Sequence, residues 1–111
     1  MILVIREPAS EEQIAQMLAF LENYIKLAVD VHREILAGGG VMHADCEAAL
    51  LEDGSQQEDI WGADWLPAVK QVTFESLINI RPRQDNPSLE ILDPDIRNQV
   101  SSIVVSLLSK K

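Results

Sequence analysis

The chain has 111 residues, the usual length of one domain and short for two. Its 18 acidic and 9 basic residues give a formal net charge of −9. This charge disfavours binding to nucleic acids, because such binding relies on lysine and arginine contacts to phosphates. Apolar residues make up 47% of the sequence, enough for one core without disulfides. The composition therefore predicts a single acidic domain over residues 1–111, with no nucleic-acid partner.

The N-terminus and the cysteine content indicate a cytoplasmic protein. The apolar run at residues 1–5 lacks a basic segment before it and ends at Arg6-Glu7-Pro8, unlike a signal peptide. Cys46 is the only cysteine, so an intrachain disulfide is impossible. No stretch approaches the roughly 18 apolar residues of a membrane span. We expect a reducing, cytoplasmic setting and no membrane partner.

A strand and a helix are predicted at the N-terminus. Ile2 to Ile5 is a β-branched run that ends before Pro8. Ser10 is suited to a helix N-cap, and Gln13 completes a capping box. Apolar residues then recur at helical spacing: Ile14, Met17, Leu18 and Leu21. The pattern predicts a helix that continues to about Asn23, since asparagine suits a left-handed C-cap.

Residues 24–31 are compatible with two structures. Their alternation and their strand-forming residues favour a strand, although the apolar spacing would also continue the helix. We favour a hairpin whose turn lies near residues 32–34 and whose second strand covers residues 35–37. Gly38-Gly39-Gly40 follows without the Lys-Ser/Thr of a phosphate-binding loop, which indicates a tight crossing between strands.

Three further strands are predicted in the central part of the chain. Residues 43–52 and 58–66 are the first two, joined by a turn at Asp53-Gly54-Ser55. Gly62 marks the expected place of a β-bulge in the second. Residues 72–81 alternate most regularly between two faces and predict the third strand.

A loop over residues 81–89 leads to the last predicted helix. Asp93 is its N-cap and Pro94 its first residue, and Lys110-Lys111 complement its negative end. One apolar stripe follows the cap: Ile96, Val100, Ile103, Val104, Leu107 and Leu108. These elements predict an α+β fold with one mainly antiparallel sheet of five to six strands. The N-terminal and C-terminal helices are expected to pack on one face of it.

The first candidate site lies in the predicted strand after the glycines. There His43, Asp45 and Glu47 share one face, and a histidine beside carboxylates is suited to general-base catalysis or to part of a metal site. Successive side chains on that face lie about 6.5–7 Å apart, too far for direct hydrogen bonds. A metal would need a further ligand such as His32 or Asp30. The alternative is a solvated face with His43 in a salt bridge, and we predict no metal and no cofactor.

The second candidate site is a polar cluster after the third of these strands. Its members are Asn79, Arg81, Arg83, Gln84, Asn86 and Ser88. Arginine recognises carboxylate or phosphate with two parallel hydrogen bonds, so the cluster is suited to anion or ligand binding. The alternative is that the arginines are structural ion-pair partners in this acidic chain. If both clusters share the sheet face opposite the helices, Arg81 meets Asp45 or Glu47 in a buried network.

Two tryptophans lie close together in the sequence. An unbroken strand places Trp61 and Trp65 on one face, and a bulge at Gly62 would separate them. Tryptophan is enriched in interface hot spots, so we expect one ring in the core and the other at a dimer or partner contact. Cys46 has only Ala44 and Ala48 beside it on its face, which favours a buried, inert thiol.

Three motifs run through the central part of the chain. They are Gly39-Gly40-x-x-His43-Ala44-Asp45-x-Glu47, Gly54-Ser55-x-Gln57-x-Asp59-x-Trp61-Gly62 and Ser76-Leu77-Ile78-Asn79-Ile80-Arg81-Pro82-x-Gln84-x-Asn86-x-Ser88. In these motifs the chain resembles a family of small bacterial proteins of unknown function that is common in cyanobacteria. The resemblance covers most of the chain, ending in the helix at Asp93. It implies no activity.

Two functional hypotheses follow. The first is a non-catalytic binding or assembly protein that contacts a second copy of itself or another protein. The second is a small ligand- or metal-binding, hydrolase-like enzyme in which His43, Asp45 and Glu47 act with Arg81 as an anion clamp. The sequence contains no nucleophile elbow, Walker loop, CxxC pair or HExxH motif, which lowers the expectation of an enzyme.

Overall fold

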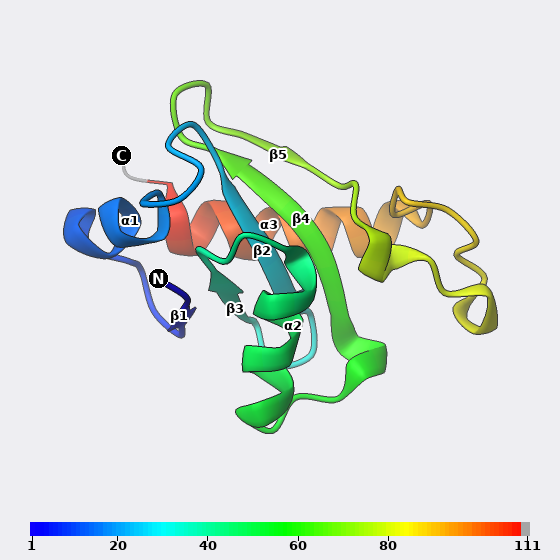
Figure 1. The fold of residues 1–111 in the computed structure, drawn as a ribbon. Coiled ribbons are helices and arrows are strands. Elements are labelled where there is room, and N and C mark those ends of the chain that lie inside the picture. Colours follow the sequence, from blue (N-terminus) through cyan, green and yellow to red (C-terminus); the bar gives the residue numbers. More distant parts are fainter. Residues whose placement is uncertain (110–111) are drawn as a thin grey trace.

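The computed structural model describes residues 1–109. It has one antiparallel sheet of five strands in the order β1-β3-β2-β4-β5 (Figure 1). The strands are β1 (Leu3–Ile5), β2 (Ile25–Asp30), β3 (Ile35–Gly38), β4 (Ile60–Leu66) and β5 (Gln71–Thr73). The helices are α1 (Glu11–Met17), α2 (His43–Glu52) and α3 (Pro94–Leu108), with short 3₁₀ turns at Gln57–Asp59, Leu77–Asn79 and Pro82–Gln84. The predicted α+β class with a single antiparallel sheet is confirmed.

Helices cover both faces of the sheet. Along β2, Leu27 and its alternate neighbours belong to a hydrophobic cluster that includes Val100 and Val104 of α3. Ala28 points to the opposite face and joins a second cluster with Cys46 and Leu50 of α2. Figure 1 shows α3 behind the central strands and α2 in front of them. The expectation of an uncovered sheet face opposite the helices is therefore wrong.

The first helix begins as predicted and ends earlier. Ser10 and Gln13 form the capping box, in which each side chain accepts a hydrogen bond from the other residue's backbone N–H. The helix stops at Met17, six residues before Asn23, and the chain turns through Glu22 at a φ of 62°. Met17 is buried in the same cluster as the residues of α3. The left-handed turn needed to enter β2 thus falls before the predicted C-cap.

The predicted hairpin and the C-terminal helix are confirmed. β2 and β3 pair directly, and Asp30 shapes the turn between them by accepting hydrogen bonds from the backbone N–H groups of His32 and Arg33. The side chain of Asp93 caps α3 through the N–H of Asp95. The predicted effect of Lys110 and Lys111 on the helix dipole lies outside the described residues.

Residues 43–52 form α2, so the predicted strand there is wrong. The segment is rich in alanine, leucine and glutamate, which have high helix propensity. Cys46 and Leu50, one turn apart, are both buried against the sheet. Asp45 lies in the first turn, where a negative charge favours the helix. The burial of Cys46 and Leu50 against the sheet therefore outweighs the alternating pattern that predicted a strand.

The C-terminal end of α2 is tied to the hairpin by an ionic cluster. Asp53, which follows the helix, forms salt bridges with Arg6 and with Arg33, the latter at 2.8 Å. Arg33 also donates to the hydroxyl of Ser55 at 2.8 Å. Hydrogen bonds from Arg6 and Arg33 hold the pKa of Asp53 below its ordinary value of 3.8. The cluster fixes where α2 ends relative to the turn between β2 and β3.

Only the first part of the predicted strand at residues 72–81 enters the sheet. β5 pairs with β4 from Gln71 to Thr73, and the chain then leaves the ladder for the 3₁₀ turn at Leu77–Asn79. The predicted bulge at Gly62 is also wrong, because β2 and β4 pair one-to-one across this position. Gly62 instead allows a close approach: a Cβ atom there would lie 2.5 Å from Cβ of Ser76. No helix within residues 1–109 is long and apolar enough to cross a membrane.

Candidate functional site

Arg81 joins its own loop to α2 and to the turn before β4. Its Nε donates to the carbonyl of Ile78 at 2.9 Å, and Nη1 donates to the carbonyl of Gln57 at 2.8 Å and to Gln84 Oε1 at 3.3 Å. Nη2 forms a salt bridge with Glu47 of α2 at 3.3 Å. Four of the five guanidinium N–H groups are therefore directed at the protein itself.

The guanidinium of Arg81 also lies over the ring of Trp61, with 4.9 Å between its carbon and the ring centroid. Burial lowers the pKa of Arg81, and the charge of Glu47 acts in the opposite direction. Arg81 therefore acts first as a cross-link between α2, β4 and the segment that follows β5. One N–H of Nη2 remains for a ligand.

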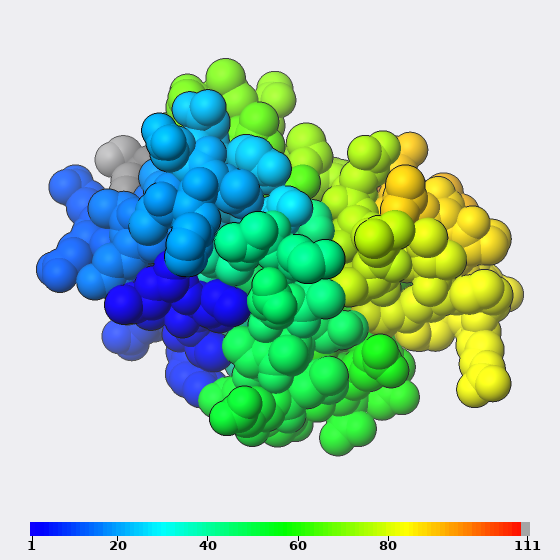
Figure 2. Space-filling view, viewed as in Figure 1, coloured from blue at the N-terminus to red at the C-terminus, as the bar shows by residue number. Residues whose placement is uncertain are grey.

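A hollow of about 480 Å³ opens beside this cross-link, between α2 and residues 77–84. Its lining consists of Glu47, Gln57, Leu77, Ile78, Ile80, Arg81, Pro82, Arg83 and Gln84. Leu77 is 72% exposed and Ile80 46%, so two large apolar side chains beside the hollow are open to solvent. The Arg83 side chain has no hydrogen bond or ion pair within residues 1–109. Figure 2 shows the hollow between the green surface of α2 and the yellow surface of residues 77–84.

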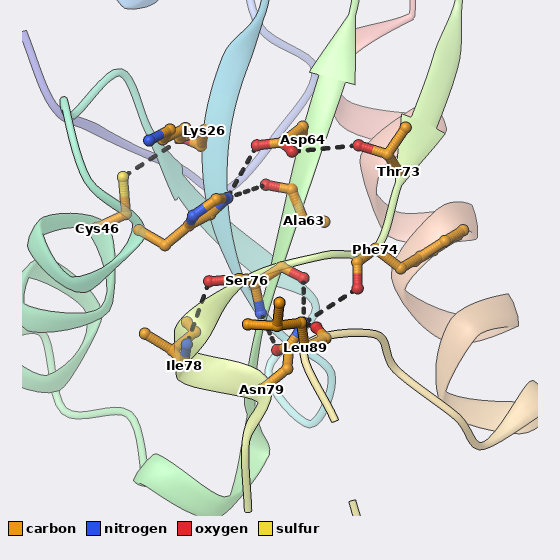
Figure 3. Close-up of polar contacts among 12 residues, drawn as sticks. Lys26, Cys46, Ala63, Asp64, Thr73, Phe74, Ser76, Ile78, Asn79 and Leu89 are labelled. Carbon is orange, nitrogen blue, oxygen red and sulfur yellow. Dashed lines mark hydrogen bonds and ion pairs between the residues drawn. The ribbon is translucent and has the colours of Figure 1, made fainter. Parts of the chain in front are cut away.

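The asparagines of the predicted cluster are buried and hold the loop. Asn79 takes the place of a neighbouring strand at Gly62: its Oδ1 accepts from the N–H of Gly62 at 2.7 Å, and its Nδ2 donates to the carbonyl of Gly62 at 3.0 Å. Figure 3 shows that Nδ2 also points to the carbonyls of Phe74 and Leu89. The side chain of Asn79 thus satisfies the backbone groups of Gly62 on the part of the β4 edge that β5 does not cover.

Asn86 organises the return of the same loop. Its Nδ2 donates to the carbonyls of Asn79 at 2.8 Å and Glu90 at 2.9 Å, and its Oδ1 accepts from the N–H of Leu92 at 2.9 Å. The hydroxyl of Ser88 accepts from the N–H of Glu90. The predicted cluster thus divides in two. Asn79, Asn86 and Ser88 hold the loop, whereas Arg81, Arg83 and Gln84 line the hollow.

The structure does not bring His43, Asp45 and Glu47 together on one face. In the helix, Asp45 is exposed, and Glu47 is engaged by Arg81. Nε2 of His43 lies 2.8 Å from Oδ1 of Asp64 on β4. Sequence reasoning missed Asp64, although a carboxylate in the apolar strand at residues 60–66 was a signal for it. The His43 and Arg81 clusters lie on different cavities, which share Leu77 and Ile78 as lining.

Both tryptophans lie on the α3 side of the sheet, as their common parity predicts. Trp61 is 2% exposed and Trp65 1%, and both belong to the main hydrophobic cluster. Neither ring offers an exposed surface to a partner, so the two residues act in the core. Within residues 1–109, no three His, Cys, Asp or Glu side chains are grouped so that they could hold a metal ion.

Cys46 is predicted to react slowly in the folded protein. It is fully buried, its Sγ donates to the carbonyl of Lys26, and burial raises the pKa of its thiol to about 11. At pH 8 about one thiol in a thousand is then ionised, and the thiolate is the reactive form. Labelling with a thiol-reactive disulfide reagent should therefore be slow, and it should accelerate about tenfold between pH 8 and pH 9. Urea-unfolded protein is the control, and equally fast labelling of the folded protein would contradict the burial.

The comparisons with known proteins identify a family and no function. The family model described as "Protein of unknown function (DUF5674)" matches residues 3–107. No curated protein and no solved structure shows significant similarity to the chain. The predicted resemblance to a family of unknown function is confirmed. Because the match covers almost the entire sequence, the chain belongs to the DUF5674 family.

Proposed function

We propose that the hollow between α2 and residues 77–84 is a non-catalytic binding site that takes an amphipathic organic anion, such as a carboxylate. The observation that carries the proposal is the combination of exposed Leu77 and Ile80 with the guanidinium of Arg83, which has no partner within residues 1–109. A volume of about 480 Å³ is in the range of small-molecule sites, which are mostly apolar with a few polar groups.

The lining suggests how such a ligand is held. Leu77, Ile80 and Pro82 provide apolar contacts for its carbon skeleton. Arg83 offers a planar fork of donors that fits a carboxylate with two parallel hydrogen bonds. The remaining N–H of Arg81 supplements it, and the charge of Glu47 is already compensated by the salt bridge with Arg81. The site therefore favours an anion even though the whole chain is acidic.

Binding of anilinonaphthalene sulfonate and of a medium-chain fatty acid tests the proposal. Backbone NMR shifts on titration are expected to concentrate at residues 77–84. Arg83→Gln should weaken binding about tenfold, the usual effect of losing one exposed charge-assisted contact. Leu77→Ser should weaken the binding of fatty acids, and the loss of affinity should be largest for those with longer hydrocarbon chains.

Two exposed residues of α3 provide matched controls. Arg97→Gln removes a guanidinium, and Val105→Ser removes an exposed apolar side chain, both outside the hollow. Neither change should alter affinity. Equal losses of affinity in Arg83→Gln and Arg97→Gln would mean that only the net charge of the protein matters, and would refute the site. Ligand-induced NMR shifts confined to other surfaces would refute it as well.

A further inference from the structure

We propose that a second cavity, at the first turn of α2, is a hydrolytic site for small anionic carboxylic esters, with His43 as general base. This site goes beyond the binding function proposed above. It lies on the other side of Leu77 and Ile78 from the 480 Å³ hollow. It involves Asp64 and Lys26, in place of the Asp45 and Glu47 indicated by the sequence.

Hydrogen bonds fix the orientation of the imidazole. Nε2 of His43 lies 2.8 Å from Oδ1 of Asp64 and 3.1 Å from the carbonyl oxygen of Ala63. Both partners are acceptors, so in the neutral ring Nε2 carries the proton and Nδ1 holds the lone pair. Asp64 is itself oriented by Thr73, whose hydroxyl donates to Oδ2 at 3.1 Å, as Figure 3 shows. A base oriented by a carboxylate, which is positioned in turn by a third group, is the arrangement used in acid–base catalysis.

The same cavity is lined by His43 and by the cationic side chain of Lys26. Its volume is about 180 Å³, and its lining is Lys26, Met42, His43, Ala44, Ser76, Leu77 and Ile78. Nδ1 of His43 has no hydrogen bond, and the ammonium of Lys26 has no hydrogen bond or ion pair, within residues 1–109. Lys26 is directly opposite Asp64 in the pairing of β2 with β4, so the strand register sets its position. Lys26 is half-buried, and without a carboxylate partner within residues 1–109 its positive charge favours an anionic ligand.

The reaction requires only water as second reactant. Nδ1 of His43 accepts a proton from a water molecule while the water oxygen bonds to the ester carbonyl carbon. The tetrahedral intermediate then breaks its C–O bond to the alcohol, and the imidazolium returns the proton to the leaving oxygen. Lys26 attracts the negative group on the acyl part of the substrate. The small volume limits that acyl part to a few carbon atoms.

Two chromogenic esters test the proposal: p-nitrophenyl acetate, which is neutral, and mono-p-nitrophenyl succinate, which carries a carboxylate. In the whole protein, His43→Gln keeps a donor for Asp64 and should lower kcat/KM about 100-fold for both esters, a typical contribution of a general base. Lys26→Gln should lower kcat/KM about tenfold more for the succinate ester than for the acetate ester, and an equal loss for both would contradict the role of Lys26.

The chain offers a matched control, because it has two histidines and the other, His32, is exposed in the hairpin turn. His32→Gln should leave both rates unchanged. Equal rates for the wild type and His43→Gln would overturn the proposal. A ¹⁵N NMR spectrum gives a readout that does not depend on turnover: the neutral ring of His43 should carry its proton on Nε2, and a proton on Nδ1 would overturn the proposed role.

Discussion

Replacing Asn79 with alanine is expected to lower the free energy of unfolding by about 4 kcal/mol. The side chain is fully buried, and its removal leaves both the N–H and the carbonyl of Gly62 without the partners they have in the native protein. Each buried polar group left unsatisfied costs about 1–3 kcal/mol, and the carbonyls of Phe74 and Leu89 also lose a donor. Urea denaturation measures the change, and the melting temperature should fall by about 15 °C.

Asn98 provides the matched control for this prediction. It is an exposed asparagine on α3, and Asn98→Ala should change stability by no more than about 0.5 kcal/mol. A loss below about 1 kcal/mol in Asn79→Ala would mean that another group pairs with the edge of β4 at Gly62. The result also bears on the proposed ligand site, because Asn79 holds the segment that carries Leu77 and Ile80.

Replacing Trp61 with alanine is expected to cost about 4 kcal/mol of stability as well. The ring is almost completely buried between the sheet and α3, so its removal leaves a large cavity in the main cluster. It also removes the aromatic face on which the guanidinium of Arg81 lies. Calorimetry or urea denaturation checks the change, and light scattering before and after the substitution checks association.

Phe20 is the appropriate aromatic control, because it is exposed in the turn that follows α1. Phe20→Ala should leave stability within about 0.5 kcal/mol of the wild type. If Trp61→Ala instead left stability intact and changed only the state of association, the ring would be an interface residue, as the sequence alone allowed. The burial of the ring leads us to expect the opposite.

The elements that the sequence predicted correctly depend on interactions within a few residues. Ser10 with Gln13, and Asp93 with Pro94, act within one helical turn, so their side chains mark the helix starts wherever the rest of the chain lies. The alternation along β2 and β4 likewise reports which side chains share a face, and it placed the two tryptophans together.

The elements that the sequence mispredicted depend on what lies opposite them. The ten residues of α2 have one dominant buried pair, Cys46 and Leu50, too short a pattern to distinguish a helix from a strand. The regular alternation after β5 is real, but Asn79 pairs with Gly62 across 17 residues, and the chain leaves the sheet to allow it. A tertiary hydrogen bond here outweighs a local β propensity.

By itself, the sequence determined the α+β class, the helix caps, the hairpin of β2 and β3 and the apolar stripe of α3, because each is encoded in residues that are neighbours in the chain. The tertiary structure alone decided which polar groups meet. His43 finds Asp64 across 21 residues, and Arg81 finds Glu47 across 34. The first contact exists because α2 packs against the face of the sheet where Asp64 points, and the second because α2 also lies beside residues 77–84. No pattern along the chain carries that information.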